Sequence, residues 1–278
     1  MDAQTVSNEL LASMQKDFES SKPVFPTFLN VSIQIKKAID RENFSLDMLV
    51  PLIQLEPMIA TRLIGLANSA FYCRSGNAVK DIRGAVMRLG CSVVKSVAFA
   101  VATKQLAEGE ELRAVRKTVT ELWKHSITTA TWAYTLALHA KSYSPDEALF
   151  VGMLQNIGKF YVISKAVKLT KDRELILDCA HQWHLFASAR LLDALGVNVQ
   201  VRSAATRLYK GTTPPTSLVE IIQCAALLSD DQNPLSLSDY EVHMFIRTAL
   251  QEKLGDEYDL LMDLALSEYT KSIQVLLQ

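Results

Sequence analysis

Glycine is scarce in this chain, and so are the patterns typical of β-sheets. Ten glycines occur in 278 residues, about half of the ~7 per cent usage of average proteins. Runs of alternating β-branched residues bounded by turns are hard to find. Signals for helix starts, and apolar residues at helical spacing, recur along the chain instead. The sequence therefore predicts an all-α fold.

Cysteine pairs and long apolar runs are lacking too. No two cysteines form a Cys-x-x-Cys pair, so the sequence indicates neither a zinc site nor a disulfide framework, and we expect reduced, mostly buried thiols. The best apolar stretch, residues 93–103, is too short for a membrane span and contains Lys95. We therefore expect a soluble chain with no membrane-spanning segment. The four cysteines are Cys73, Cys91, Cys179 and Cys224.

Neither sign of charge dominates the chain. It has 29 Lys and Arg against 30 Asp and Glu, a formal net charge of -1, so no global field draws it toward nucleic acid or an anionic membrane. The basic clusters at 36–37 and 113–117 lack interleaved aromatic residues, and we interpret them as solvated faces rather than nucleic-acid sites. Residues 1–22 are too polar for a signal peptide, so we expect an N-terminal helix or tail on a cytoplasmic protein.

Capping residues divide the first part of the chain into short helices. Ser45 is expected to begin a helix that Pro51 must kink or delay. Asp81 is predicted to cap a helix that stops at Gly90, and Ser92 to cap the next one. These signals predict compact helix-turn-helix steps.

Longer helices are predicted after the charged stretch 108–117, which we interpret as a solvated connection between two lobes. A helix over residues 119–137 has one apolar stripe, and His125 lies on the face beside it, turned inward or sideways. Further helices are expected over residues 173–181, 184–195, 215–228, 236–253 and 256–277.

One predicted helix is unusual because polar residues lie in an otherwise apolar segment. Residues 144–147, Ser-Pro-Asp-Glu, form a strong start signal. The following residues 148–164 are apolar almost all round, which predicts the buried central helix of the fold. Gln155, Asn156 and Lys159 lie in its middle and need partners there.

Several of these segments are similar to the HDOD family, bacterial signalling domains related in fold to HD-type metal phosphohydrolases. The resemblance runs from about residue 26 to residue 228. Its most specific part in the first lobe is Leu66-Ala67-Asn68-Ser69-Ala70. In the second lobe it rests on Leu122-Trp123-Lys124-His125-Ser126 and on Phe150-Val151-Gly152-Met153-Leu154-Gln155-Asn156-Ile157-Gly158-Lys159.

The resemblance implies a domain organisation. We expect an HD-domain-like helical bundle over residues 23–228, with an N-terminal lobe at about 23–107 and an HD-like lobe at about 117–228. A C-terminal helical extension is expected over residues 229–278.

The metal site of HD-type enzymes is changed in this sequence. The resemblance implies a helix-borne histidine, an adjacent His-Asp pair and a later aspartate as metal ligands. His125 keeps the first position, Gln155 and Asn156 replace the pair, and the last position falls on Ala226. Two amides and a methyl group lack the negative charge that favours metal binding. We therefore expect no metal, no cofactor and no catalysis, and a hydrogen-bonded cluster of Gln155, Asn156 and His125 instead.

Two further residues are candidates for a ligand pocket. Lys159 follows the family's Gly-Lys step and either meets a small anionic ligand or extends its ammonium from a buried helix to solvent. Because Phe160 follows Lys159, no phosphate-binding P-loop is present. His184 falls where HD relatives often carry a histidine, although a partly exposed or capping role is the ordinary interpretation.

Three functions stay open on this basis. The first is a non-catalytic signalling domain that binds a partner protein or a small ligand. The second is a weak magnesium-dependent phosphohydrolase that uses His125, Asn156 and Lys159. The third is a scaffold whose C-terminal extension binds a partner helix, unless its apolar residues only cover the core. Those residues are Leu260, Leu261, Leu264 and Ile273.

Overall fold

A computed structural model describes residues 2–19, 29–73, 76–141, 143–197, 217–229, 234–235, 248, 252 and 255–264. Every regular element within these ranges is helical, which confirms the predicted all-α fold. The elements are α1 (Ala3–Glu19), α2 (Asn30–Ile39), α3 (Leu46–Gln54), α4 (Pro57–Ala67), α5 (Ile82–Leu89), α6 (Cys91–Glu108), the 3-10 helix η2 (Glu110–Leu112), α7 (Arg116–Ala140), α8 (Pro145–Leu154), α9 (Ile157–Leu169), α10 (Arg173–Ala194), α12 (Leu218–Leu228) and α14 (Asp256–Leu264).

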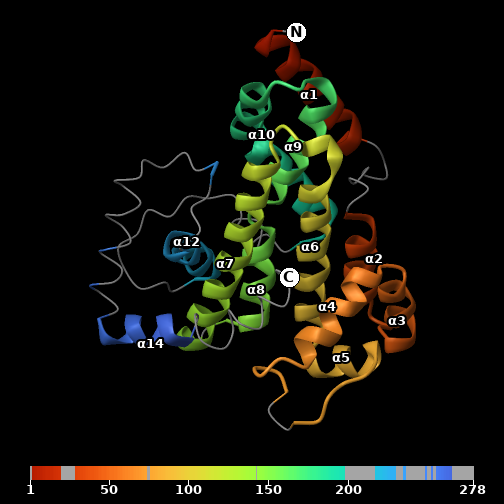
Figure 1. Cartoon of the computed structure of the whole chain (residues 1–278), viewed down its shortest axis with the longest axis vertical. Coiled ribbons are helices and arrows are strands. Elements are labelled where there is room, and N and C mark those ends of the chain that lie inside the picture. The colour runs from red at the N-terminus through yellow and green to blue at the C-terminus, as the bar shows by residue number, and fades with distance from the viewer. Residues whose placement is uncertain are drawn as a thin grey trace.

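Short helices α2 to α5 gather on one side of the long helix α6 (Figure 1). The caps of α3 and α5 are the ones that the sequence predicts. Ser45 accepts a hydrogen bond from the Met48 amide, and Asp81 accepts one from the Gly84 amide. Pro51 lies inside α3 and does not delay its start.

The start of α6 differs from the prediction. Gly90 has φ of +79° and separates α5 from α6, which bend by 113° at this point. Ser92 does not cap α6, because the helix already begins at Cys91. A left-handed residue suits glycine, so one residue makes the whole turn and no side-chain cap is used.

Helices α6, α7, α8 and α12 form the centre of the molecule, with α8 packed on both α6 and α7 (Figure 1). The stripe predicted on the 119–137 helix is buried in α7, including Val119, Ala130 and Ala137. Ser144 caps α8 as expected, and Ser217 with Glu220 forms a reciprocal capping box at the start of α12.

The predicted central helix over residues 148–164 is in fact two helices. The chain leaves the helix at Gln155 and Asn156, which separate α8 from α9. The two halves pack on different partners through glycines. A Cβ at Gly152 would lie 2.7 Å from the Ala130 Cα of α7, and one at Gly158 would overlap the His184 carbonyl oxygen of α10. Each close approach fixes one half, so tertiary packing overrides the continuous apolar pattern.

For α10 the prediction was wrong in the opposite sense, since one helix was predicted as two. Residues 173–181 and 184–195 were predicted as two helices, but α10 is continuous from Arg173 to Ala194. Gly196, with φ of +63°, follows its end as expected. The intervening Gln182 and Trp183 contact Ser7 of α1, with the Trp183 Nε1 donating to the Ser7 hydroxyl over 3.0 Å.

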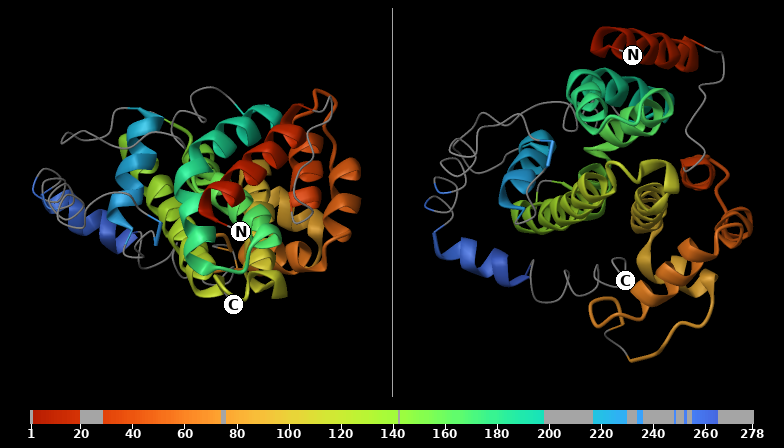
Figure 2. Two further views of the ribbon diagram at one scale, coloured as in Figure 1. Left: turned by 90° about the horizontal axis from the view of Figure 1, so that it is seen from above. Right: turned by 45° about the horizontal axis from the view of Figure 1, so that its top comes forward.

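Helix α1 lies across α9 and α10 at one end of the molecule (Figure 2). Its residues Val6, Leu10 and Met14 are fully buried. At its C-terminal end, Asp17 accepts a hydrogen bond of 2.6 Å from the Tyr161 hydroxyl and pairs with Lys165 at 2.5 Å. The N-terminal helix therefore belongs to the folded body.

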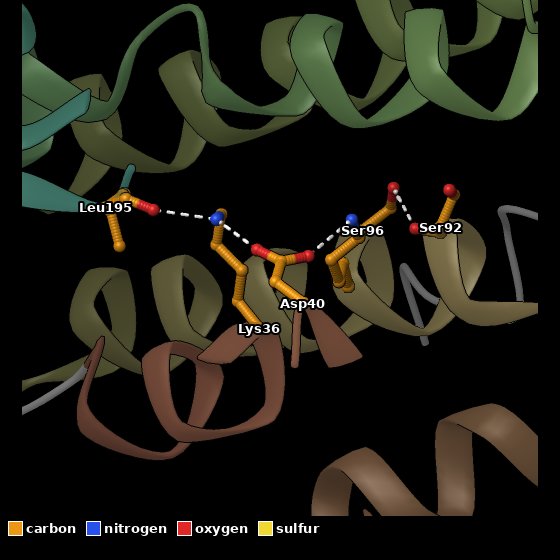
Figure 3. A network of polar contacts seen from close by, with 6 residues as sticks. Lys36, Asp40, Ser92, Ser96 and Leu195 are labelled. Carbon is orange, nitrogen blue, oxygen red and sulfur yellow. Dashed lines mark hydrogen bonds and ion pairs between the residues drawn. The ribbon is translucent and has the colours of Figure 1, made fainter. Parts of the chain in front are cut away.

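A polar network joins the first lobe to the second (Figure 3). The Lys36 ammonium of α2 donates to the Leu195 carbonyl at the end of α10 over 2.7 Å and pairs with Asp40 at 2.5 Å. Lys95 of α6 reaches the other Asp40 oxygen at 3.4 Å. The prediction that Lys36 lies on a solvated face is wrong, because the residue is 5% exposed. Its cation satisfies a helix C-terminus, where positive charge is favourable.

Apolar contacts cross the predicted lobe boundary. One buried cluster runs from α1 through α10, and a second joins α7, α8, α12 and α14. The domain limits stay predictions.

In the C-terminal extension, Leu261 is buried while Leu260 and Leu264 are exposed. Ile273 and the predicted 236–253 helix, apart from Thr248 and Glu252, lie outside the described residues. No single described helix is long and apolar enough to cross a membrane. Two bent helix pairs, α3 with α4 and α5 with α6, are together long and apolar enough by length and composition alone.

Candidate functional site

His125 lies on the buried face of α7. The residue is 2% exposed, and its Nε2 is 3.5 Å from the Thr129 hydroxyl one turn later. The neighbouring Ser126 is also buried and donates its hydroxyl proton to the Leu122 carbonyl oxygen over 2.9 Å. The inward orientation expected for His125 is confirmed.

Asn156 connects the α8–α9 break to this face of α7. Its Nδ2 donates a 3.0 Å hydrogen bond to the Ser126 hydroxyl, which lies next to His125 in the chain. The buried amide is therefore bound to a protein group at a position where HD-type enzymes hold a metal ligand. This bond spans 30 residues and helps to fix the point where α8 gives way to α9.

Gln155 does not join that cluster as predicted. Its Nε2 is buried without a hydrogen-bond partner, so the expected bond from this amide to Asn156 or His125 is not formed. A buried donor without an acceptor is costly. The sequence placed Gln155 beside Asn156 on a continuous helix, whereas the two residues form the break between α8 and α9.

The side chains at the four family positions do not fit a catalytic metal. His125 supplies one imidazole, Gln155 and Asn156 supply amides, and Ala226, on α12, has no ligating atom. Within the described ranges, no three His, Cys, Asp or Glu side chains come together in a group that could hold a metal ion. Divalent metals of hydrolases need several nitrogen or carboxylate ligands, which this set does not provide.

Lys159 occupies the first turn of α9 and faces the interior. The residue is 7% exposed, and burial lowers the pKa of its ammonium to about 8. The Lys159 ammonium forms no hydrogen bond or ion pair with any residue that the structure describes. The sequence allowed the Lys159 ammonium to extend to solvent. The structure restricts this, because most of the side chain is enclosed.

His184 is half-buried on α10 and does not cap a helix, because α10 continues past it. Its Nδ1 lies 3.1 Å from the Ala180 carbonyl oxygen and 2.9 Å from that of His181. In the tautomer that satisfies these carbonyls, Nδ1 carries the proton and Nε2 is left as the acceptor. Burial, and then the charge of Lys159, lower the pKa of His184.

His181 is a member of this group that the sequence did not reveal. Burial and the Lys159 charge lower its pKa, while Asp178 opposes that shift. Its Nδ1 is buried without a hydrogen-bond partner. His181 and His184 are three residues apart and share one face of α10. The spacing was visible in the sequence, but the predicted helix break between them concealed its meaning.

The predicted site residues thus fall into two groups. His125 and Asn156 belong with Ser126 on α7, while Lys159 and His184 belong with His181 between α9 and α10.

A family model, the HDOD domain, matches residues 25–207. The chain belongs to the HDOD family. No curated protein matches it.

Solved HDOD-like structures share its fold. A proposed metal-dependent phosphohydrolase from Shewanella amazonensis SB2B has 22% identity and a TM-score of 0.69, covering 98% of this chain and 99% of its own. An HDOD domain protein of unknown function from Geobacter sulfurreducens has 16% identity and a TM-score of 0.59, covering 99% and 98%. A proposed signal transduction protein from Marinobacter aquaeolei VT8 has 17% identity and a TM-score of 0.56, covering 100% of this chain and 67% of its own.

The HDOD segment Leu66-Ala67-Asn68-Ser69-Ala70 has a structural task in this chain. Asn68 ends α4, and its side chain binds both backbone groups of Val79, donating to the carbonyl at 2.8 Å and accepting from the amide at 2.7 Å. Arg88 of α5 donates to the carbonyls of Ala67 and Asn77. These contacts hold the loop between α4 and α5, so Asn68 and Ala67 of this HDOD segment help to position the backbone.

Proposed function

We propose that this HDOD protein is a non-catalytic regulatory domain in bacterial signal transduction, acting by binding a partner protein or a small ligand. The observation that carries the proposal is the Asn156–Ser126 hydrogen bond, which engages a family ligand position with a protein group. The fold is shared with proteins named for phosphohydrolysis and for signal transduction, so the residues of the site decide between the two.

The charge at the family metal positions supports binding rather than hydrolysis. A phosphohydrolase metal lowers the pKa of bound water and polarises a phosphoryl oxygen. Carboxylates and imidazoles provide the ligand field for that task. Here His125 stands with two neutral amides, and one amide is already bound to Ser126. The Asn156 amide thus has a protein partner for its buried donor without an ion.

The alternative is a weak metal-dependent phosphohydrolase that acts on a nucleotide or another phosphoester. It requires His125 and Asn156 to hold a cation such as magnesium and Lys159 to contact phosphate. The two proposals differ in one observable, which is saturable, metal-dependent turnover.

A substrate screen separates them. The purified protein is assayed against nucleotides and phosphomonoesters with magnesium, manganese or ferrous iron, and His125→Asn serves as the matched variant. We expect no hydrolysis above that of the variant. Metal-dependent turnover that saturates with substrate and disappears in His125→Asn would favour the phosphohydrolase and defeat the regulatory proposal.

A further inference from the structure

The group between α9 and α10 consists of three nitrogen bases, Lys159 on α9 and His181 and His184 on α10. Gly158 lets the α9 backbone touch α10, since a Cβ there would overlap the Ser188 hydroxyl and the His184 carbonyl oxygen. Lys159 is the next residue, so its backbone is fixed against the helix that carries both histidines. The Lys159 charge acts on His181 and on His184. The three side chains therefore share one electrostatic environment.

Lys159 is in an unfavourable position for a structural lysine. It is enclosed, with 7% of its surface exposed, and it has no acceptor among the described residues. It also lies in the first turn of a helix, where the backbone dipole repels positive charge. A buried cation normally has a paired anion. No described residue supplies that anion for Lys159.

The two histidines add ring nitrogens to the same place. His181 Nδ1 is buried with no partner in the described part of the chain. His184 is oriented by its Nδ1 contacts with two carbonyl oxygens, which leave Nε2 for another group. The one-face spacing of these residues on α10 lets both imidazoles serve one ligand.

We propose that Lys159, His181 and His184 form a binding site for the phosphate group of a small molecule. The inference rests on the regulatory function proposed above and names the ligand chemistry of that function. A phosphate group fits because it offers several acceptor oxygens to Lys159 and the imidazoles. Near neutral pH it is also partly protonated, so it can donate to a neutral imidazole nitrogen.

Neighbouring acidic groups do not neutralise the site. Asp178, on α10, acts on His181, yet the pKa of that histidine is still lowered. Asp17 of α1, which packs on α9 and α10, is paired with Lys165. Glu110 of η2, which packs on α9, is paired with Arg116.

Titration calorimetry with inorganic phosphate tests the site. The full chain is titrated at pH 7 in the presence of a chelator, with chloride at matched ionic strength as the reference. We expect saturable binding to the wild-type protein. Lys159→Met should weaken it about 10- to 100-fold, because a charged hydrogen bond is lost. Lys168→Met removes an exposed lysine from the same helix and should leave the affinity unchanged.

Thermal unfolding of the same variants separates binding from folding. Lys159→Met should fold, since a buried charge without a partner is replaced by an apolar side chain of similar length. Phosphate should raise the midpoint of the wild type and of Lys168→Met, but not that of Lys159→Met. No saturable phosphate binding by the wild type, or equal affinity in Lys159→Met, overturns the inference. Either result would leave the regulatory proposal intact. Metal-dependent turnover is the result that would contradict the regulatory proposal.

Discussion

The Asn156 amide and the Ser126 hydroxyl form a buried polar pair at a position that the resemblance assigns to a metal ligand. Asn156 is 3% exposed and Ser126 is 1% exposed, so neither group reaches bulk water. A buried donor needs its acceptor. The pair is therefore expected to contribute to stability, whatever ligand the protein binds elsewhere.

Removing the acceptor tests this contribution. Ser126→Ala leaves the Asn156 Nδ2 donor without the Ser126 oxygen, and we expect the free energy of unfolding to fall by about 1–3 kcal/mol. Urea denaturation followed by circular dichroism gives this value. Thr128→Ala, on a partly exposed position of the same helix, is the control and should cost less than about 1 kcal/mol. Equal losses in the two variants would contradict a special role for the buried pair.

Lys159 predicts a pH dependence of stability. Its pKa in the folded state is about 8, below the ordinary lysine value of 10.5, so between these values the unfolded state binds more protons. The contribution of Lys159 to the free energy of unfolding therefore increases as pH rises from about 8 to about 10.5, by up to roughly 3 kcal/mol in total. Below pH 8 the penalty of the buried charge is fully present. At pH 7, Lys159→Met should be more stable than the wild type.

The difference between wild type and Lys159→Met isolates this residue from other groups. For example, burial and the hydrogen bond to Asp17 raise the pKa of Tyr161. Tyr161 therefore stabilises the folded state less as pH rises above the ordinary pKa of tyrosine. Urea midpoints of both proteins from pH 7 to pH 10 provide the measurement. A stability difference that does not change over this interval would show that Lys159 is not charged and buried.

At the level of elements, caps were predictable and helix junctions were not. Ser45, Asp81 and Ser144 cap their helices as their local sequence indicates, because a cap depends on a few adjacent residues. The α8–α9 break depends on Gly152 and Gly158, whose contacts lie on other helices. Sequence patterning cannot show which partner each glycine approaches.

The α9–α10 contact predicts a large effect at Gly158. An added Cβ meets backbone and a buried hydroxyl of α10, which cannot move as a flexible side chain would. We expect Gly158→Ala to lower the free energy of unfolding by about 1–3 kcal/mol or more. Gly109→Ala should cost less, because its Cβ would lie 3.2 Å from the Leu106 carbonyl oxygen. Urea denaturation ranks the two, and the reverse order would contradict the packing described.

Helix α1 is expected to be required for full stability. Leu10 is fully buried between α1 and the body, so Leu10→Ala should cost about 2–5 kcal/mol. The exposed Gln15 of the same helix is the control, and Gln15→Ala should change stability by less than about 0.5 kcal/mol. Both values come from chemical denaturation. A loss at Leu10 no larger than that at Gln15 would indicate that α1 is not part of the cooperative unit.

At the scale of the whole molecule, the family resemblance predicted more than local patterns did. It located an all-helical fold and the chain's HDOD membership, which the family model confirms over residues 25–207. It also brought His125, Gln155 and Asn156 together as one group. The structure instead leaves the Gln155 Nε2 without a partner. Gln155 lies at the break between α8 and α9, which the sequence did not predict.

The division of the candidate residues into two groups has the same origin. Lys159 was predicted to belong to the same candidate ligand pocket as His125 and Asn156 because it occupies the family's Gly-Lys step. The turn at residues 155–156 carries α9 onto α10, where His181 and His184 lie. A binding group of this kind depends on which helices meet, and that is a property of the folded molecule.

The central claim is that the family's metal site is lost, and metal content tests it most directly. The protein is produced in medium supplemented with iron, manganese and zinc, purified without chelator, and analysed by inductively coupled plasma mass spectrometry. We predict far less than one equivalent of any of these metals per chain. Close to one or two equivalents per chain, reduced in His125→Asn, would contradict the account.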